Sequence, residues 1–244
     1  MPAHRPQSQV GPWFYRDTEC MVIEFETDAE AALAVLPSDL VLVEPATGFM
    51  VIETNHWTTL GPYSEVYLGI LCTYQGAVYG YVPGVYVTGE NSQIVGREVF
   101  GFGKKRPDRI ELISHGNGTV EAIMDVLPGD RALRAQMMAS KNEPAEALAG
   151  LPLLCLRIVP DAEGGPAPAL AQLIEANFKA EPLIGADGRA EVFSGPGHMA
   201  LDGPSDVQFP VKKVTKAVYA HFNAVLPYPK IVKTYSQDEL KGCV

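Results

Sequence analysis

The sequence has few cysteines, and the four that it has are not clustered. They lie far apart, with no C-x-x-C pair and no histidine at metal-ligand spacing: Cys20, Cys72, Cys155 and Cys243. Zinc sites and disulfide frameworks depend on such spacings. We therefore expect reduced thiols, no bound metal and a cytoplasmic protein.

A concentrated basic surface and a long apolar run are also missing. The net charge is -10 and the basic residues are not gathered into a stripe, so the charge pattern of a nucleic-acid binder is absent. The first ten residues are polar and contain proline, and no apolar run approaches the roughly 18 residues of a membrane span. Neither nucleic acid nor a membrane is an expected partner.

Several common enzyme motifs fail as well. A phosphate-binding Walker loop requires a glycine where Glu98 stands and Ser or Thr where Lys105 stands. A dinucleotide-binding G-x-G-x-x-G requires a third glycine where Arg106 stands. No G-x-S-x-G is present, so an α/β-hydrolase triad has no basis.

What the sequence does have is strand character. Its 47% hydrophobic content over 244 residues is enough for a sizeable core, and we expect a single domain over residues 1–244. Short runs rich in Val, Ile, Tyr and Phe alternate with turn residues. Two hairpins are predicted, one from Arg109–Ser114 and Thr119–Leu127, the other from Tyr63–Tyr74 and Ala77–Val87.

Helical signals are few. Asp28 is a candidate N-cap for a helix over Ala29–Leu36, and a second helix is predicted over Glu90–Phe100. No alternation of strands and helices is visible, which excludes a Rossmann or TIM-barrel architecture. The fold class expected is mainly antiparallel β (α+β), with flexible ends at residues 1–15 and 236–244.

The most informative residues are the adjacent Lys104 and Lys105. Most such pairs are solvated, because lysine is rarely buried. Here the pair follows an apolar, tightly turned run from Gly96 to Gly103, which favours the floor of a cavity. In a cavity each ammonium disfavours the charge of the other and burial lowers the pKa again, so one amine can be free at neutral pH and attack a carbonyl.

This segment resembles the acetoacetate decarboxylase family. In that family a G-R-E segment is followed by a few apolar residues, usually a proline, and then Lys-Lys, of which the first forms a Schiff base. Gly96-Arg97-Glu98 and the two lysines match this spacing, with Gly103 in place of the proline. The resemblance recurs from about Glu19 to about Tyr235. It implies a closed barrel or cone with outer strands, and a homo-oligomer.

The resemblance also implies roles for individual residues. Lys104 condenses with a small oxo acid or ketone, and Lys105 lowers its pKa. The segment Leu60 to Glu65 resembles the one that delivers an active-site glutamate, so Glu65 is expected to position the substrate or move protons. Four further residues are candidate substrate contacts: Arg16, Tyr63, Met50 and Phe102.

Two departures from the family pattern bear on the reaction. An arginine and a second glutamate of the family's decarboxylases fall at Thr18 and Met50. Arg16, two positions from the first, keeps the same strand face and is a candidate substitute, whereas Glu53, three positions from the second, reverses the face and is a poor one. We therefore expect imine formation to be retained and decarboxylation of acetoacetate to be slow.

Three functions stay open at this point. The imine can serve decarboxylation of an oxo acid, or it can serve aldol cleavage or condensation, dehydration or cyclisation. A third alternative is an inactive homologue that only binds a carbonyl ligand. No metal or organic cofactor is expected, because the protonated imine is itself the electron sink.

Overall fold

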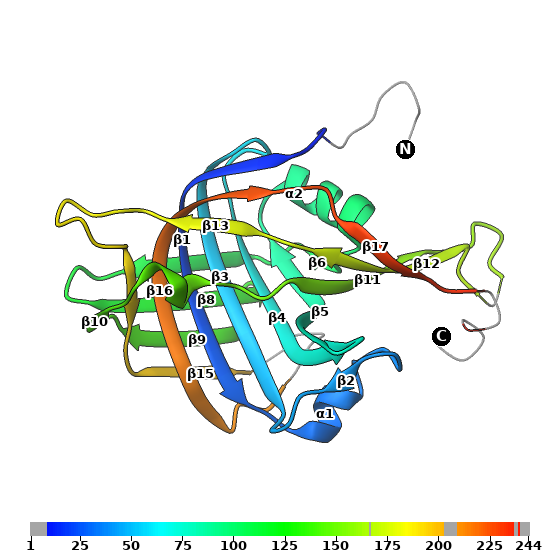
Figure 1. Ribbon diagram of the computed structural model, residues 1–244, viewed down its shortest axis with the longest axis horizontal. Coiled ribbons are helices and arrows are strands. Elements are labelled where there is room, and N and C mark those ends of the chain that lie inside the picture. The colour runs from blue at the N-terminus through cyan, green and yellow to red at the C-terminus, as the bar shows by residue number, and fades with distance from the viewer. Residues whose placement is uncertain (1–8, 166, 203–208, 237–238, 240–244) are drawn as a thin grey trace.

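The computed structural model describes residues 9–165, 167–202, 209–236 and 239. These residues form two β-sheets with few helices (Figure 1). The larger sheet contains β1 (Trp13–Glu26), β2 (Val41–Leu42), β3 (Thr47–Thr58), β4 (Tyr63–Tyr74), β5 (Ala77–Val87), β6 (Lys104–Lys105), β10 (Lys141–Asn142), β11 (Leu153–Val159), β12 (Leu170–Ala176), β13 (Lys179–Pro182), β14 (Val192–Ser194), β16 (Lys213–Leu226) and β17 (Lys230–Thr234). The smaller sheet contains β7 (Arg109–Ser114), β8 (Thr119–Leu127), β9 (Asp130–Met138) and β15 (Gly197–Leu201).

The helical segments are short. They are α1 (Ala29–Leu33), α2 (Glu90–Val95), the π-helical turn η1 (Gly96–Phe100) and the 3-10 turn η2 (Ala145–Leu148). Asp28 caps α1 as predicted, its carboxylate accepting from the backbone amides of Glu30 and Ala31, but α1 ends before the predicted Leu36. No helix in the described part of the chain is long and apolar enough to cross a membrane.

The predicted hairpins are confirmed with their bounds, as β7–β8 and β4–β5. The predicted helix before the lysines is confirmed as α2 followed by η1. The predicted flexible start is wrong for residues 13–15, because β1 begins at the fully buried Trp13. Residues 1–8 lie outside the described residues, as does most of the predicted flexible end.

The larger sheet is open, which corrects the predicted closed barrel or cone. Its neighbouring strands run in the order β10-β14-β16-β1-β3-β4-β5-β11-β12-β17, and no described pairing joins the two ends. The physical reason lies at β11, which pairs with β5 only at Leu153 and Leu154. Beyond that point β11 diverges, and it extends with β12 and β17 away from the sheet (Figure 1).

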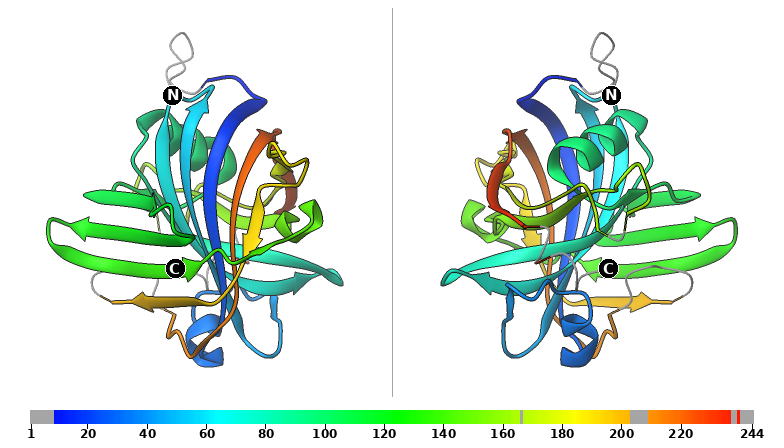
Figure 2. Two further views of the ribbon diagram at one scale, coloured as in Figure 1. Left: turned by 90° about the vertical axis from the view of Figure 1, so that its left-hand side faces the viewer. Right: turned by 90° about the vertical axis from the view of Figure 1, so that its right-hand side faces the viewer.

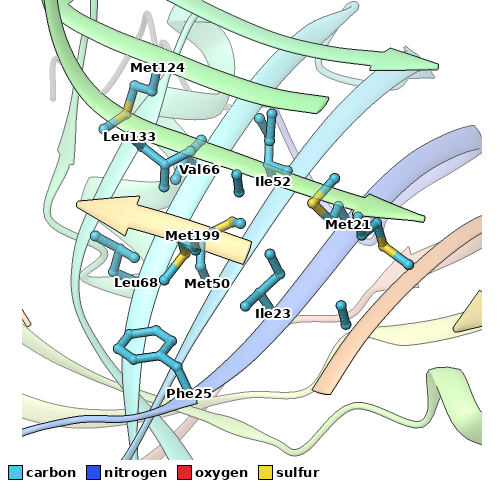
Figure 3. Packing of buried hydrophobic residues seen from close by; sticks show 14 of the residues in the cluster. Met21, Ile23, Phe25, Met50, Ile52, Val66, Leu68, Met124, Leu133 and Met199 are labelled. Atoms are coloured by element: carbon cyan, nitrogen blue, oxygen red, sulfur yellow. The ribbon is translucent and has the colours of Figure 1, made fainter. Parts of the chain in front are cut away.

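The main core lies between the two sheets. In Figure 2 the smaller sheet extends to one side of the long strands β1, β3 and β4. Side chains of the long strands meet methionine and leucine side chains of the smaller sheet there, as Figure 3 shows. This core buries every second residue of each long strand, because successive side chains of a strand point to opposite faces. The other face of the same strands is left for a cavity.

Candidate active site

The turn that carries Lys104 begins in α2. After η1 the chain reverses at Gly101, which has a φ of 79°, a conformation that favours glycine. The chain then runs into β6, which pairs in parallel with β5 so that Val85 lies opposite Lys104. Gln93 and Arg97 both donate side-chain hydrogen bonds to the Lys104 carbonyl, which fixes this short strand against the helical turn.

Gly96 is required for the lysine to pass. A Cβ atom at this position would lie 2.5 Å from both Cδ and Cε of Lys104. Any other residue would therefore displace the lysine side chain. The first glycine of the Gly96-Arg97-Glu98 segment is explained by this close approach of backbone and side chain.

The Lys104 side chain ends in a buried polar pocket. Its Nζ lies 2.7 Å from Oε2 of Glu65 and 2.8 Å from Oγ of Ser92. The rings of Tyr63 and Phe102 flank the same nitrogen, with centroids at 5.8 and 5.7 Å. Lys104 is only 6% exposed, so its amine is held in one place and shielded from bulk water.

A second carboxyl group faces the same site. Glu53 on β3 lies directly opposite Glu65 on β4, and it is only 4% exposed. Burial and the neighbouring charge of Glu65 raise the pKa of Glu53 to about 8, although the nearby Asn55 side chain and the Lys104 charge act in the opposite direction. Glu53 is therefore mainly neutral at pH 7 and can donate a proton.

These side chains line a cavity of two adjoining chambers. The inner chamber, of about 50 Å³, has the polar groups of Tyr15, Glu53, Glu65 and Lys104 in an otherwise largely apolar wall. The outer chamber has a volume of about 160 Å³. The two chambers share four lining residues: Glu53, Tyr67, Leu153 and Phe178.

Of the sequence-predicted residues, the structure brings Lys104, Glu65 and Phe102 together in the inner chamber. Tyr63 lies behind the lysine, outside the chamber lining, and its hydroxyl donates to the Tyr15 hydroxyl at 3.2 Å. Lys105 is exposed, whereas its neighbour Lys104 is buried, so their side chains leave β6 on opposite faces.

Arg16 does not reach the cavity, which corrects its expected role. Its guanidinium donates to the Tyr15 carbonyl at 2.9 Å and lies over the Phe14 ring on the exposed side of β1. Arg16 and Thr18 were expected to share a face, but β1 has a bulge between Tyr15 and Thr18, and Asp17 has a φ of 50°. An extra residue in the strand reverses the alternation.

Met50, a predicted substrate contact, does not line the cavity either. It is fully buried in the core between the sheets, on the face away from the cavity. Glu53 was judged a poor substitute because a step of three residues reverses the face, but it is this reversal that puts Glu53 into the cavity. The site therefore has two glutamates.

Three lining or contacting residues were not singled out as site residues by the sequence. Ser92 lies on α2, is 1% exposed and accepts a hydrogen bond from Lys104. Tyr15 comes from β1 and Phe178 from the connection between β12 and β13, and neither has a motif around it. Only the position of Ser92, on the predicted helix that leads into the chain reversal before Lys104, offers a signal in retrospect.

The family model described as acetoacetate decarboxylase matches residues 1–236. The chain belongs to the acetoacetate decarboxylase family. A relative from Mesorhizobium japonicum, acetoacetate decarboxylase 3, is 31% identical over 98% of this chain and 91% of its own length. Acetoacetate decarboxylase 1 from Bradyrhizobium diazoefficiens is 29% identical over 93% of this chain and 88% of its own.

Solved structures share the fold. The acetoacetate decarboxylase of Legionella pneumophila superposes with a TM-score of 0.84 at 24% identity, covering 96% of this chain and 93% of its own. The enduracididine biosynthesis enzyme MppR, complexed with the condensation product of pyruvate and imidazole 4-carboxaldehyde, has a TM-score of 0.74 at 16% identity, covering 94% and 92%. The family implies a lyase-type enzyme with a small oxo acid as substrate.

Proposed function

We propose that this protein is a Schiff-base lyase that decarboxylates an oxo acid through an imine at Lys104. The observation that carries the proposal is the Lys104 amine, buried beside a cavity and hydrogen-bonded to Glu65 and Ser92. A buried, oriented amine facing a chamber is suited to attack a carbonyl carbon held there.

Imine formation proceeds in two steps. The neutral amine of Lys104 adds to the ketone carbon, after its proton has passed to the Glu65 carboxylate at 2.7 Å. One proton moves from the nitrogen to the former ketone oxygen, and the resulting hydroxyl group leaves as water when it takes a second proton, which neutral Glu53 is placed to give. The nitrogen keeps one hydrogen and the positive charge, which gives the protonated imine.

Decarboxylation follows from the charge on the imine. The electron pair of the bond to the carboxylate carbon moves toward the nitrogen, so carbon dioxide leaves and an enamine forms. The enamine carbon then takes a proton from a carboxyl group of the inner chamber, and water hydrolyses the imine to release the ketone and the amine. The one hydrogen left on the nitrogen can be donated to a single oxygen at a time, and Glu65 and Ser92 are the two acceptors placed to receive it.

Lys105 can affect this chemistry only through its charge. Its side chain lies on the exposed face of β6, so it contacts neither the substrate chamber nor the Lys104 amine across the strand. We keep for Lys105 the proposed role of a neighbouring cation that favours the neutral amine.

A second candidate function is supported by the lining of the chambers. No arginine occurs among the described lining residues, so no guanidinium seats the substrate carboxylate. If the protonated imine instead loses a proton from the neighbouring carbon to a carboxylate of the inner chamber, the enamine that forms can attack an aldehyde, which is an aldol condensation and needs no loss of carboxylate. MppR, whose fold is similar, is known in complex with a condensation product of pyruvate.

Borohydride trapping with product analysis tests both candidates. Incubation with acetoacetate, pyruvate and a set of larger oxo acids, followed by borohydride, is expected to add the reduced ligand mass at Lys104. Lys104→Met should abolish this label and all turnover, whereas Lys105→Met should keep the label. Carbon dioxide release identifies the lyase, and a condensation product with an added aldehyde identifies the alternative. No label from any carbonyl compound would leave only a ligand-binding homologue.

A further inference from the structure

The outer chamber is larger than the one that holds the reactive lysine. Its volume is about 160 Å³, against about 50 Å³ for the inner chamber. One enclosed water molecule needs roughly 10–15 Å³ of such volume, and we take the same volume for one non-hydrogen atom of a ligand. The inner chamber then has room for only a few such atoms, and the outer chamber for about three times as many. Acetoacetate is slightly larger than the inner chamber, so it would fill that chamber and leave most of the outer one to water.

The wall of the outer chamber is predominantly apolar. Val22, Phe49, Val51 and Val218 project into it from the face of the long strands opposite the core. The segment 147–151, which includes the end of η2, covers it and crosses in front of the strands in Figure 1. Apolar walls with a few polar groups are typical of a site that binds an apolar ligand body.

The two chambers adjoin at four shared lining residues, which form the neck between them. Glu53, Tyr67, Leu153 and Phe178 line both of them. An extended group attached to the ketone carbon at Lys104 reaches the outer chamber by passing these four side chains. Because Glu53 at the neck is mainly neutral at pH 7, an uncharged group passes it without facing a buried ionised carboxylate.

The outer chamber has a partly exposed ion pair at one end. Lys216 and Glu24 line it, and their Nζ and Oε1 atoms form an ion pair at 3.0 Å. A substrate with a second carboxylate at that end would have to compete with Glu24 for the lysine. An apolar tail meets no such competition, since it ends against the valine and phenylalanine side chains.

We propose that the substrate is a 3-oxo acid whose ketone carries an apolar body of about five to eight carbons, straight-chain or aromatic, and that this body fills the outer chamber. The inference rests on the proposed function, because it takes the ketone carbon to be bound at Lys104. The carboxyl group then stays in the inner chamber with Glu65 and Glu53, and the apolar body lies between β1, β3 and the covering segment.

The experiment compares four 3-oxo acids by decarboxylation rate and by borohydride trapping: acetoacetate, 3-oxooctanoate, 3-oxo-3-phenylpropanoate and a straight-chain 3-oxo diacid of the same length as 3-oxooctanoate. We expect kcat/KM for the two apolar compounds to exceed that for acetoacetate by about 10²-fold or more, since one well-buried methylene alone is worth roughly 10-fold or more. The diacid should be far poorer than 3-oxooctanoate. Equal or better kcat/KM for acetoacetate would overturn the inference.

Val51→Phe fills the outer chamber and leaves the inner one unchanged, because Val51 lines only the former. It should reduce kcat/KM for the two apolar compounds by at least roughly 10-fold and that for acetoacetate by no more than about 3-fold. Val78→Phe, on the exposed surface of β5, is the matched control. Ala147→Phe in the covering segment is a second filling variant, should Val51→Phe fail to fold.

The two failures can be told apart. If no compound labels Lys104, the proposed function fails. If acetoacetate labels Lys104 and the filling variants reduce all four substrates equally, the proposed function stands and the inference about the outer chamber is overturned.

Discussion

The two faces of the long strands β1, β3 and β4 carry different chemistry on the same backbone. One face presents Met50 and Ile52 to the core between the sheets. The other presents Val51 and Glu53 to the cavity. Because side chains alternate along a strand, a step of one or three residues exchanges a packing role for a chemical one. A sheet can thus supply a rigid core and a reactive site without any additional layer.

The packed core face also holds the reactive groups on the cavity face firmly in place. Glu53 and Glu65 lie in register on neighbouring strands whose opposite faces are locked into the core. Sites built on strands keep their geometry better than sites on loops. Lys104 is the contrast, since it depends on a helical turn, on Gly96 and on the two-residue strand β6.

The largest expected effect comes from putting a charge on the core face. Met50→Glu should lower the free energy of unfolding by about 3–5 kcal/mol, because it buries a carboxylate among apolar side chains with no cation near it. Urea unfolding measures the loss. Met50→Leu, which nearly conserves volume, should cost less than about 1.5 kcal/mol. A stable Met50→Glu protein with faster carbon dioxide release would place position 50 in the cavity after all.

On the cavity face, Glu65→Gln should spare the fold and reduce turnover. The change removes the acceptor for the Lys104 proton, and loss of a general acid or base typically costs about 10²-fold or more. Steady-state kinetics and thermal unfolding report the two properties separately. Glu26→Gln, at an exposed ion pair on β1, is the control. Full activity of Glu65→Gln would remove Glu65 from the mechanism.

The buried carboxyl group of Glu53, on the cavity face, should make the free energy of unfolding depend on pH. Its pKa is raised to about 8, so between about pH 4.5 and 8 the folded protein holds a proton that the unfolded chain has released. Stability from this group is therefore present at low pH and is lost as pH rises through that window, by a few kcal/mol. Unfolding of Glu53→Gln should be less dependent on pH than unfolding of the unsubstituted protein. Parallel pH profiles for the two proteins would show that Glu53 is not buried as an acid.

Local structure could be predicted where the sequence has turn chemistry. Both hairpins and the helix before Lys104 were predictable because glycine and asparagine mark their ends. The sequence could not predict which face of β3 points to the cavity, because residues 49 to 52 are all apolar and all buried. Met50 and Ile52 are buried in the core, whereas Phe49 and Val51 are buried in the cavity wall. Periodicity carries no information when both faces are apolar.

The candidate site could be predicted only in part for a related reason. Lys104 and Glu65 follow recognisable segments, whereas the contributions of Glu53 and Ser92 depend on which strand face and which helix side point to the cavity. The position of Arg16 depends on a bulge at Asp17, and no glycine or proline there indicates the bulge in the sequence. The open sheet likewise depends on long-range pairing of β11 with β5, which local sequence does not encode.

The smallest expected effect concerns Lys105. Lys104 and Lys105 lie on opposite faces of β6, as Glu53 and Met50 lie on opposite faces of β3. Lys105→Gln removes a cation on the exposed face, so it should raise the pH at which borohydride trapping is half-maximal, but only slightly. A charge roughly 10 Å away through a water-like medium contributes about 0.4 kcal/mol, equivalent to about 0.3 pH unit, and salt reduces it further. Trapping rates measured across pH at two salt concentrations test this. A shift of a full unit or more, insensitive to salt, would mean that the two ammonium groups interact directly.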